Sequence, residues 1–573
     1  MSDEISPRDA RRLFVLRLLL GLFQGLLLLG LYRLRKTLGP MPAVPLWLLF
    51  GAVPLIALGA IGRLRRVSLA AWLAGAALLT SGLGAYDVFV RTGASGGAID
   101  FASPQLALFL AVALYILHHL ITAADAERRW RGSYDRYFDE AWLDAVRLAL
   151  AAAFVGALWL LLFLGAALFK LIGVKLVEQL IRNDWFAFPI TCVFLAIALH
   201  ITDVRAQLVR GARTLALTLL SWLLPILAAF VGLFLLTIPF TGLAPLWATR
   251  SATATMLAVC AAFVILINAV YQDGERDDFP PMVLRWAVRL AGVLLAPMVL
   301  IAAYSLALRI GQYGLSPERI YAAMTVLMAA IYAAGYLWAA VRRGPWMKPL
   351  ETTNWLAAYV AVAAIVLVFS PLVDPARLSV GDQLKRLETG RTAAKDFDYR
   401  FLHFDSGRWG LEALKTLAAG KGPVTAQAVI AAAKDELKAP RYGAPRPSAE
   451  RLGASLTGAV PPDFANQTWS AGEDPAAGCG EGTFCHAIVG DVDGQAGDEV
   501  IVFRYSDAEV YGRRDGRWRR IGTLAGGHCG SDAEAVAKGR FNLLPPEPMP
   551  SVVVDGRRMV FAAQPDCPAV ELK

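Results

Sequence analysis

Three side chains able to bind an anion stand in the short polar segment RIGQYGLSPER, between two long apolar runs. They are Arg309, Tyr313 and Arg319. An ionisable residue placed in membrane hydrocarbon costs at least ~2.5–3.5 kcal/mol, so it indicates a function or nearby water. Guanidinium groups bind phosphates and carboxylates through paired hydrogen bonds. We therefore expect these residues to contact lipid headgroups, an anionic ligand or the C-terminal tail of the chain.

The remaining residues of this segment are typical of a helix start. Ser316 is a favoured N-cap residue, and Pro317 suits the first helical position. The Glu318 carboxylate is favoured by the dipole of the helix that follows. Gly311 and Gly314 allow the chain to turn before that helix.

Two further arginines, Arg285 and Arg289, lie four positions apart at the start of another apolar run. This spacing places both on one face of a helix. We expect them to contact phosphate headgroups at the cytoplasmic surface.

Polar side chains also end two apolar runs at the same expected depth. They are His118, His119, His200 and Asp203. Such a set could bind a metal or relay protons. All four lie within about one turn of the expected interface, where polar tips reach water, and this interfacial placement is the favoured interpretation.

The loop GDVDGQAGDEV offers three carboxylates, those of Asp491, Asp493 and Asp498, to a hard cation such as Ca²⁺. It resembles the short Asp-x-Asp-Gly calcium loop of integrin-type propeller repeats, of which only one copy is present. It does not fit an EF-hand, because Val502 stands where the bidentate Glu would be. An Asp/Gly-rich turn before a strand is the alternative, and it is favoured.

Four of the six cysteines lie in the polar C-terminal part: Cys479, Cys485, Cys529 and Cys567. An even number in a region expected outside the cytoplasm favours two disulfides of undetermined pairing. Zinc is the alternative, but the spacing matches no standard zinc finger. The other two, Cys192 and Cys260, lie in apolar runs, where cysteine acts as a small hydrophobic residue.

The composition places these residues in a membrane protein. The chain has 573 residues, of which 56% are hydrophobic and 18% charged, and its mean hydropathy is +0.49. Apolar runs dominate as far as about residue 370, and the rest has the composition of a soluble protein. The net charge of +9 comes from basic residues in short loops, so we do not expect nucleic-acid binding.

The length of the apolar runs predicts an all-α polytopic membrane bundle of about eleven transmembrane helices. The expected spans are 18–32, 45–61, 69–90, 106–122, 146–169, 186–202, 215–238, 252–271, 283–304, 320–341 and 355–369.

The distribution of basic residues predicts the orientation of this bundle. Four loops rich in Lys and Arg fall on the same side as the N-terminus, which places the N-terminus in the cytoplasm and the C-terminal region in the periplasm. The exceptions are Arg33, Arg35 and Lys36, which fall on the opposite side.

The C-terminal region predicts a soluble α+β part that ends in a small antiparallel β module. The expected domains are a transmembrane module at 1–373, a helical extracytoplasmic segment at 374–437, a Pro/Gly/Ala linker at 438–462 and a cysteine-containing β domain at 463–573. We expect Ser379 to cap a helix that ends at Gly390. After the linker, apolar and polar residues alternate with a period of two, which predicts strands. The expected strands are DEVIVFRY, AEVYGRR, RWRRIGTL, SVVVDG and RRMVFAAQ.

Three segments of the chain resemble, in order, a bacterial inner-membrane family known as domain of unknown function 4153. They are LTIPFTGLAPLWATRSATATMLAVCAAFVILINAVYQDG, YSLALRIGQYGLSPERIYA and FDYRFLHFDSGRWGLEAL. The residues that carry the resemblance best are Gly242, Leu243, Trp247, Asn268, Tyr313, Gly314, Leu315 and Arg319. The resemblance implies an integral membrane protein and supplies no catalytic residue. The β module lies outside it.

Together these features favour a bacterial inner-membrane protein that is not an enzyme and carries a periplasmic sensing or binding domain. None of the common catalytic motifs is present. We expect no cofactor apart from the candidate Ca²⁺; the partners would be membrane lipids and an envelope protein or small ligand. The alternative is a transporter or lipid-linked transferase that uses polar residues near the ninth to eleventh spans or the acidic loop QDGERDD.

Overall fold

The computed structural model divides the chain into two compact units, Met1–Leu437 and Lys438–Lys573. The described residues run from 7 to 560, except for 93–98, 244–251, 275–279, 344, 422–423, 439–455, 459, 468, 470–473, 476–478, 480–484, 493–496, 505–506, 515, 525–531, 542–550 and 555–556.

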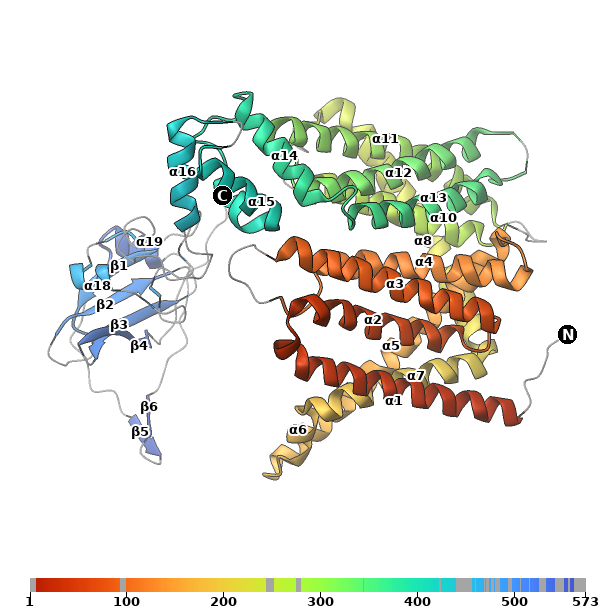
Figure 1. Ribbon diagram of the computed structural model, residues 1–573, viewed down its shortest axis with the longest axis horizontal. Helices are drawn as coiled ribbons and strands as arrows, with labels where there is room; N and C mark the ends of the chain where they lie inside the picture. Colours follow the sequence, from red (N-terminus) through yellow and green to blue (C-terminus); the bar gives the residue numbers. More distant parts are fainter. Residues whose placement is uncertain are drawn as a thin grey trace. The chain divides into compact units, whose positions relative to one another are not determined.

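In the described part of the first unit, eleven helices are long and apolar enough to cross a membrane (Figure 1). They form because backbone groups in hydrocarbon need hydrogen-bond partners within the segment. The eleven are α1 (Pro7–Leu38), α2 (Pro40–Ala60), α3 (Arg66–Arg91), α4 (Pro104–Glu127), α5 (Tyr134–Leu171), α7 (Asp184–Val204), α8 (Ala206–Thr241), α10 (Ala252–Tyr271), α11 (Met282–Tyr313), α12 (Pro317–Val341) and α13 (Pro349–Val368). A short helix, α6 (Leu176–Ile181), follows α5. The expected helical bundle is confirmed.

Successive spans alternate in direction, so the N-terminus lies at one end of the bundle and the end of α13 at the other (Figure 1). At the far end, two of the basic residues that depart from the charge pattern have acidic partners. Arg33 lies 3.5 Å from Asp184, and Arg35 lies 3.9 Å from Asp100. The positive-inside rule counts Lys and Arg and gives little weight to acidic partners, so both residues remain exceptions to it.

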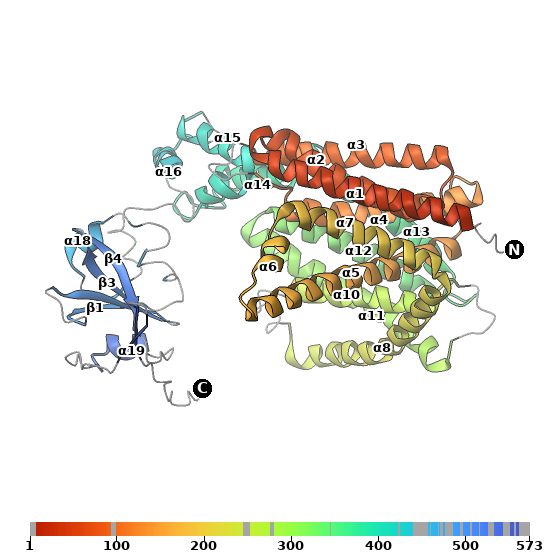
Figure 2. The ribbon, with the colours of Figure 1, turned by 90° about the horizontal axis from the view of Figure 1, so that it is seen from below.

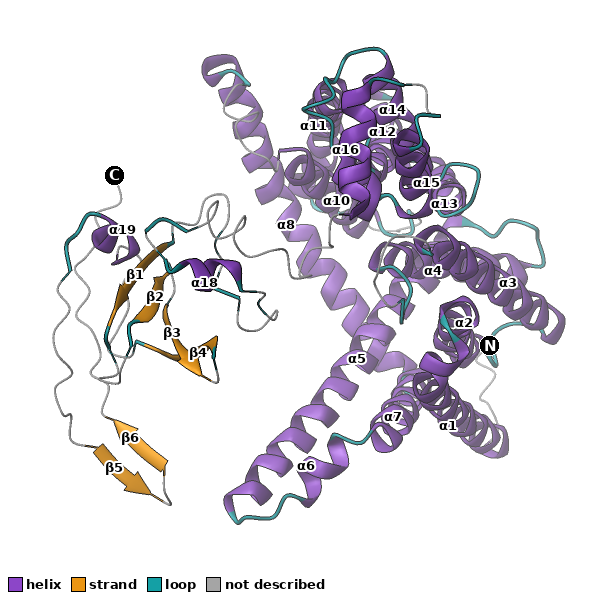
Figure 3. Ribbon diagram, turned by 60° about the vertical axis from the view of Figure 1, so that its left-hand side comes forward, coloured by secondary structure: helices purple, strands orange, loops and turns teal. Residues whose placement is uncertain are grey.

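The bundle contains two main hydrophobic cores, and Figure 3 shows the arrangement of the helices that contribute to them. The larger one is built mainly from α8, α10, α11, α12 and α13, and it includes the fully buried side chain of Phe263. The smaller one joins α2, α3 and α4 with the C-terminal end of α13. Because α4 and α13 contribute to both cores, they connect the two halves.

Glycine permits very close packing of α12 against α13. A Cβ atom added to Gly335 would lie 2.0 Å from Thr353 Oγ1, a distance that no real contact allows. A Cβ atom added to Gly292 of α11 would similarly lie 3.0 Å from the carbonyl oxygen of Tyr336. Small residues at such positions let the backbones of membrane helices approach each other.

We predict that Gly335→Ala destabilises the bundle by about 1–3 kcal/mol, the usual cost of overpacking a core. Gly156→Ala on α5 is the control, because an added Cβ there meets nothing within 4 Å. Thermal unfolding of the purified full chain would compare them. An equal midpoint for the two variants would show that α12 and α13 do not pack as closely as described.

Three further α-helices and a turn of π-helix complete the first unit. They are α14 (Pro375–Glu388), η1 (Phe401–Asp405), α15 (Gly407–Ala418) and α16 (Gln427–Lys438). They share a core of their own and lie at the end of the bundle opposite the N-terminus (Figures 1 and 2).

The start of α14 differs from the sequence prediction. Its N-cap is Asp374, whose Oδ1 accepts a hydrogen bond from the backbone N of Arg377 at 3.0 Å. Ser379 is fully buried inside the helix and does not cap it. The earlier start arises because Pro375 suits the first helical position and follows a strong capping residue. The capping prediction for Ser379 was therefore wrong.

The second unit contains an antiparallel sheet in the order β1-β2-β3-β4 and a separate hairpin of β5 and β6. Its elements are α18 (Pro462–Asn466), β1 (His486–Gly490), β2 (Glu499–Phe503), β3 (Ala508–Arg514), β4 (Arg517–Thr523), α19 (Asp532–Ala537), β5 (Ser551–Val554) and β6 (Arg557–Val560). The five expected strands are present, and β1 was not predicted. Aromatic rings fill the core beneath the sheet: Phe464 lies between 5.0 and 5.5 Å from the rings of Trp469, Trp518 and Tyr511.

Candidate functional site

The segment RIGQYGLSPER joins α11 to α12, and residues of α14 complete its hydrogen bonds. Asp382 Oδ2 accepts from the backbone N of Leu315 at 2.7 Å. Gln383 Nε2 donates to the carbonyl oxygens of Tyr313 and Leu315 at 2.9 and 3.0 Å. Arg386 Nη2 donates to two more carbonyls at the end of α11, at 2.7 and 3.0 Å. The segment is therefore a docking point for α14.

Arg319 also has a structural role in this segment. Its Nη1 donates to the carbonyl oxygen of Gly314 at 2.7 Å, and its guanidinium lies 5.6 Å from the centre of the Tyr313 ring. Ser316 caps α12 as expected, accepting from the backbone N of Arg319 at 3.4 Å. Arg319 therefore helps to close the C-terminus of α11, while the exposed Tyr313 ring supports its guanidinium.

The other arginines predicted to contact headgroups lie on α11. Arg309 is half-buried near its C-terminal end, and Arg285 and Arg289 are half-buried near its start. The Arg289 guanidinium lies 5.8 Å from the centre of the exposed Trp286 ring. A basic residue beside an exposed Trp is typical of a membrane interface. Headgroup contact by these residues stays a prediction.

In the second unit, Cys479 and Cys485 form a disulfide. Cys529 and Cys567 lie outside the described residues. Asp491 and Asp498 flank the loop between β1 and β2, while Asp493 also lies outside the described residues. Among the residues that are described, no group of three His, Cys, Asp or Glu side chains could hold a metal ion. The calcium site stays a prediction.

The tenth and eleventh spans, α12 and α13, contain an uncharged polar network that extends to α5 and α10. Tyr336 OH donates to Asn354 Oδ1 and accepts from Asn268 Nδ2, both at 2.7 Å. Asn354 Nδ2 donates to Asn268 Oδ1 at 2.6 Å and to Tyr134 OH at 2.9 Å. These four side chains satisfy one another, as buried polar groups must. The network therefore has an adequate structural explanation.

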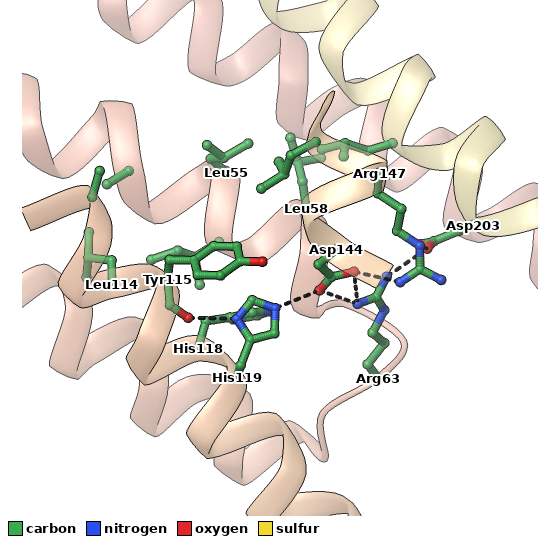
Figure 4. A pocket seen from close by; sticks show the side chains of 16 residues that line it. Leu55, Leu58, Arg63, Leu114, Tyr115, His118, His119, Asp144, Arg147 and Asp203 are labelled. Atoms are coloured by element: carbon green, nitrogen blue, oxygen red, sulfur yellow. Dashed lines mark hydrogen bonds and ion pairs between the residues drawn. The ribbon is translucent and has the colours of Figure 1, made fainter. Parts of the chain in front are cut away.

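A second set of polar side chains lies at the N-terminal end of the other half of the bundle, where it borders a cavity of about 300 Å³ (Figure 4). Apolar residues of α2, α4, α5 and α7 form the walls. The polar lining consists of Arg63, Tyr115, His118, His119, Asp144, Arg147 and Asp203.

Two carboxylates at this end bind three guanidinium groups. Asp144 lies 2.8 Å from Arg63 Nη1 and 2.7 Å from Arg147 Nη1. Asp203 lies 2.5 Å from Arg17 Nη2, 2.8 Å from Arg63 Nη2 and 3.4 Å from Arg147 Nε. We refer to these five residues as the charged cluster. It links α1, the α2–α3 loop, α5 and α7.

Arg63 is the central cation of the charged cluster. It lies in the loop between α2 and α3 and binds both carboxylates. Burial alone would lower the pKa of the Arg63 guanidinium, but Asp144 and Asp203 outweigh that effect and hold its pKa above the ordinary value. Arg63 therefore stays charged, as an arginine in a protein normally does.

The two histidines face the cavity in different ways. His119 Nδ1 lies 2.7 Å from the carbonyl oxygen of Tyr115, and its Nε2 lies 3.3 Å from Asp144 Oδ2. Both nitrogens thus face acceptors, a geometry that a doubly protonated ring satisfies. His118 Nδ1 instead accepts a hydrogen bond from Trp72 Nε1 at 3.2 Å. Its Nε2 therefore carries the proton.

The structure brings together His118, His119 and Asp203, which the sequence indicated, and His200 lies near them on α7. Both His118 and His119 are buried within the protein. Asp144, Arg147 and the fully buried Arg17 were not predicted as site residues. The available signal was the i, i+3 pair of opposite charges, Asp144 and Arg147, just before a long apolar run.

The site can bind and orient a molecule that has both polar and apolar parts. Its carboxylates are neutralised by arginines, and both nitrogens of His119 are engaged. The donors are arginine and histidine N–H groups at one end of an apolar cavity. Such an arrangement fixes a negative or hydrogen-bond-accepting group while hydrocarbon fills the rest.

These features define a multi-pass membrane protein with a charged cavity between its helices. The sequence model of the family "Domain of unknown function (DUF4153)" matches residues 27–417, which is more than half of the chain. The protein belongs to that family, as the resemblance implied. No curated protein and no solved structure matches the chain.

We predict that Asp144→Ala destabilises the protein by about 3–5 kcal/mol, because it removes the closer carboxylate partner of the buried Arg147 and one of the two carboxylates that bind Arg63. The control is Asp139→Ala on the same helix. Asp139 pairs with Arg213 but is half exposed, and an exposed pair contributes about 0–1 kcal/mol. Thermal unfolding of both variants would be measured. Equal losses would mean that the charged cluster is hydrated like an ordinary surface.

Proposed function

We propose that this protein is a bacterial inner-membrane binding protein, and not an enzyme, which takes up an amphipathic molecule in the cavity beside the charged cluster. The observation that carries this proposal is that one cavity has apolar walls and a charged end. Apolar side chains such as Leu55, Leu114 and Leu199 form its walls, and the arginines, histidines and aspartates form one end. Ligand sites typically combine apolar walls with a few convergent polar groups.

The exposure of the wall residues supports uptake from the membrane. Ala111 of α4 and Leu148 of α5 line the cavity, and both residues are exposed. We therefore place the opening of the cavity between α4 and α5. If the apolar spans cross a membrane, this opening faces lipid and admits a hydrophobic tail without passage through water.

The orientation that we propose places the N-terminus in the cytoplasm and both α14–α16 and the β unit in the periplasm. The basic loops at the N-terminal end of the bundle support it through the positive-inside rule. The disulfide between Cys479 and Cys485 supports it independently, because disulfides persist in the periplasm and are rare in the cytosol.

For the β unit we propose a sensing or binding role toward an envelope protein, a small ligand or Ca²⁺. Asp491 and Asp498 remain the candidate calcium ligands within the described residues. For the bundle surface we propose lipid headgroup contact at Arg285 and Arg289, and at Arg309 and Tyr313 on the opposite side. Tyr and Arg side chains commonly anchor a protein at such interfaces.

The test of cavity binding is to fill the cavity. We predict that Ala111→Trp lowers binding of a single-chain lipid at least tenfold, because the indole occupies the space between α2, α4 and α5. Leu108→Trp is the matched control, since Leu108 is exposed on the same helix and does not line this cavity. Native mass spectrometry of the full chain with 1-oleoyl-lysophospholipids would measure occupancy. Equal occupancy in both variants would exclude this cavity as the binding site.

The orientation can be tested through the disulfide. We use a background in which Cys192, Cys260, Cys529 and Cys567 are replaced by Ser. In intact spheroplasts we predict that a membrane-impermeant maleimide labels the remaining pair only after reduction. Adding Cys485→Ser leaves the half-buried Cys479 as a free thiol, so this control is labelled without reductant. Labelling that requires permeabilised membranes would place the β unit in the cytoplasm.

A further inference from the structure

The charged cluster contains one more cation than anion. Arg17, Arg63 and Arg147 contribute three positive charges, and Asp144 and Asp203 contribute two negative charges. The side chains of Arg17 and Arg147 are at least nine-tenths buried. An uncompensated charge in such surroundings is costly, so the cluster favours one additional anion.

The neighbouring ionisable groups do not supply that anion. Glu140 lies 3.9 Å from Arg63, but it lies at the same distance from a further cation, Arg136, so this pair adds no net charge. His119 faces two acceptor oxygens, and an imidazole ring supplies no negative charge. The excess positive charge therefore remains when the surrounding groups are included.

Several donors of the cluster have no hydrogen-bond acceptor within the described part of the chain. Arg147 lines the cavity, and its buried Nε makes no hydrogen bond, although it lies 3.4 Å from Asp203 Oδ1. Nε and Nη1 of the buried Arg17 are likewise without an acceptor. His118 also lines the cavity with an N–H at Nε2, because its Nδ1 accepts from Trp72. An oxyanion would satisfy donors of this kind.

The size of the cavity limits the apolar part of the ligand. A volume of about 300 Å³ is at the lower end of the range for small-molecule sites. Its walls are apolar from the charged end outward to Ala111 and Leu148. This shape suits one hydrocarbon chain that leaves toward the lipid.

We propose that the ligand of this cavity is a single-chain amphiphile with an anionic head, and that its phosphate or carboxylate completes the charged cluster beside Arg147 and His118. This inference rests on the proposed function, because it specifies the chemistry of the molecule that the cavity takes up. The anionic head supplies the acceptor that the buried donors lack, and the hydrocarbon chain fills the space between the apolar walls.

The experiment compares the binding of lipids that share one oleoyl chain and differ in their head group. The full-length protein would be mixed with equimolar 1-oleoyl lysophosphatidic acid and 1-monooleoylglycerol, which differ by one phosphate, and occupancy would be read by native mass spectrometry. We expect at least tenfold preference for lysophosphatidic acid. Parallel mixtures with oleate and with oleylamine would distinguish a phosphate site from a carboxylate site and would test a cationic head.

The outcomes separate this inference from the proposed function. If the protein prefers lipids with an anionic head, and this preference is lost in Ala111→Trp, the result supports both the inference and the proposed function. Equal occupancy by charged and uncharged heads, still lost in Ala111→Trp, overturns the anionic head and keeps the cavity as a binding site. A preference for oleylamine also overturns it. Binding of none of these lipids overturns both.

Charge variants provide a second test. Arg147→Gln removes the excess positive charge and should bring the preference to near parity. Arg213→Gln is the control: Arg213 lies at the same end of the bundle but pairs with Asp139 and does not line the cavity. Asp203→Asn adds one positive charge and should strengthen the preference. Thermal unfolding confirms that each variant is folded. An unchanged preference in folded Arg147→Gln and Asp203→Asn would overturn the inference.

Discussion

Charge pairing at the N-terminal end of the bundle is the constraint on which the first half of the structure depends. Arg17 is fully buried in a helix whose surroundings are apolar, and Asp203 of α7 is its partner. The same carboxylate binds Arg63, which in turn binds Asp144 of α5. Breaking a buried ion pair is far more costly than breaking an exposed one. These pairs therefore fix the relative positions of α1, α5, α7 and the α2–α3 loop.

The second half of the bundle is held together differently. There, hydroxyl and amide groups of Tyr134, Asn268, Tyr336 and Asn354 bind one another without any net charge. Glycine at position 335 brings α12 and α13 close enough for dense packing. This network carries no net charge, and its donors and acceptors are paired with one another, so it needs no ligand. The charged cluster differs because it has one excess positive charge and several N–H donors without an acceptor among the described residues.

Much of the fold follows from local sequence patterns. Apolar runs of about twenty residues predicted all eleven spans, and the alternation of period two predicted five strands. The Ser316 cap was predictable because its signal lies within four residues. The charged cluster was not, since Arg17 and Asp203 meet only after α1 packs against α7. Arg319 appeared available for a ligand because its acceptor, a carbonyl at the end of α11, cannot be identified from residue types.

The helical segment after the bundle is bonded to both halves at the end opposite the charged cluster. Asp374, the cap of α14, accepts hydrogen bonds from Tyr86 of α3 and Trp409 of α15. About two to three helix turns later, Asp382 binds the backbone N of Leu315 in the α11–α12 loop, and Arg386 binds the end of α11. A displacement of α3 against α11 would therefore have to bend α14 or break one of these sets of bonds.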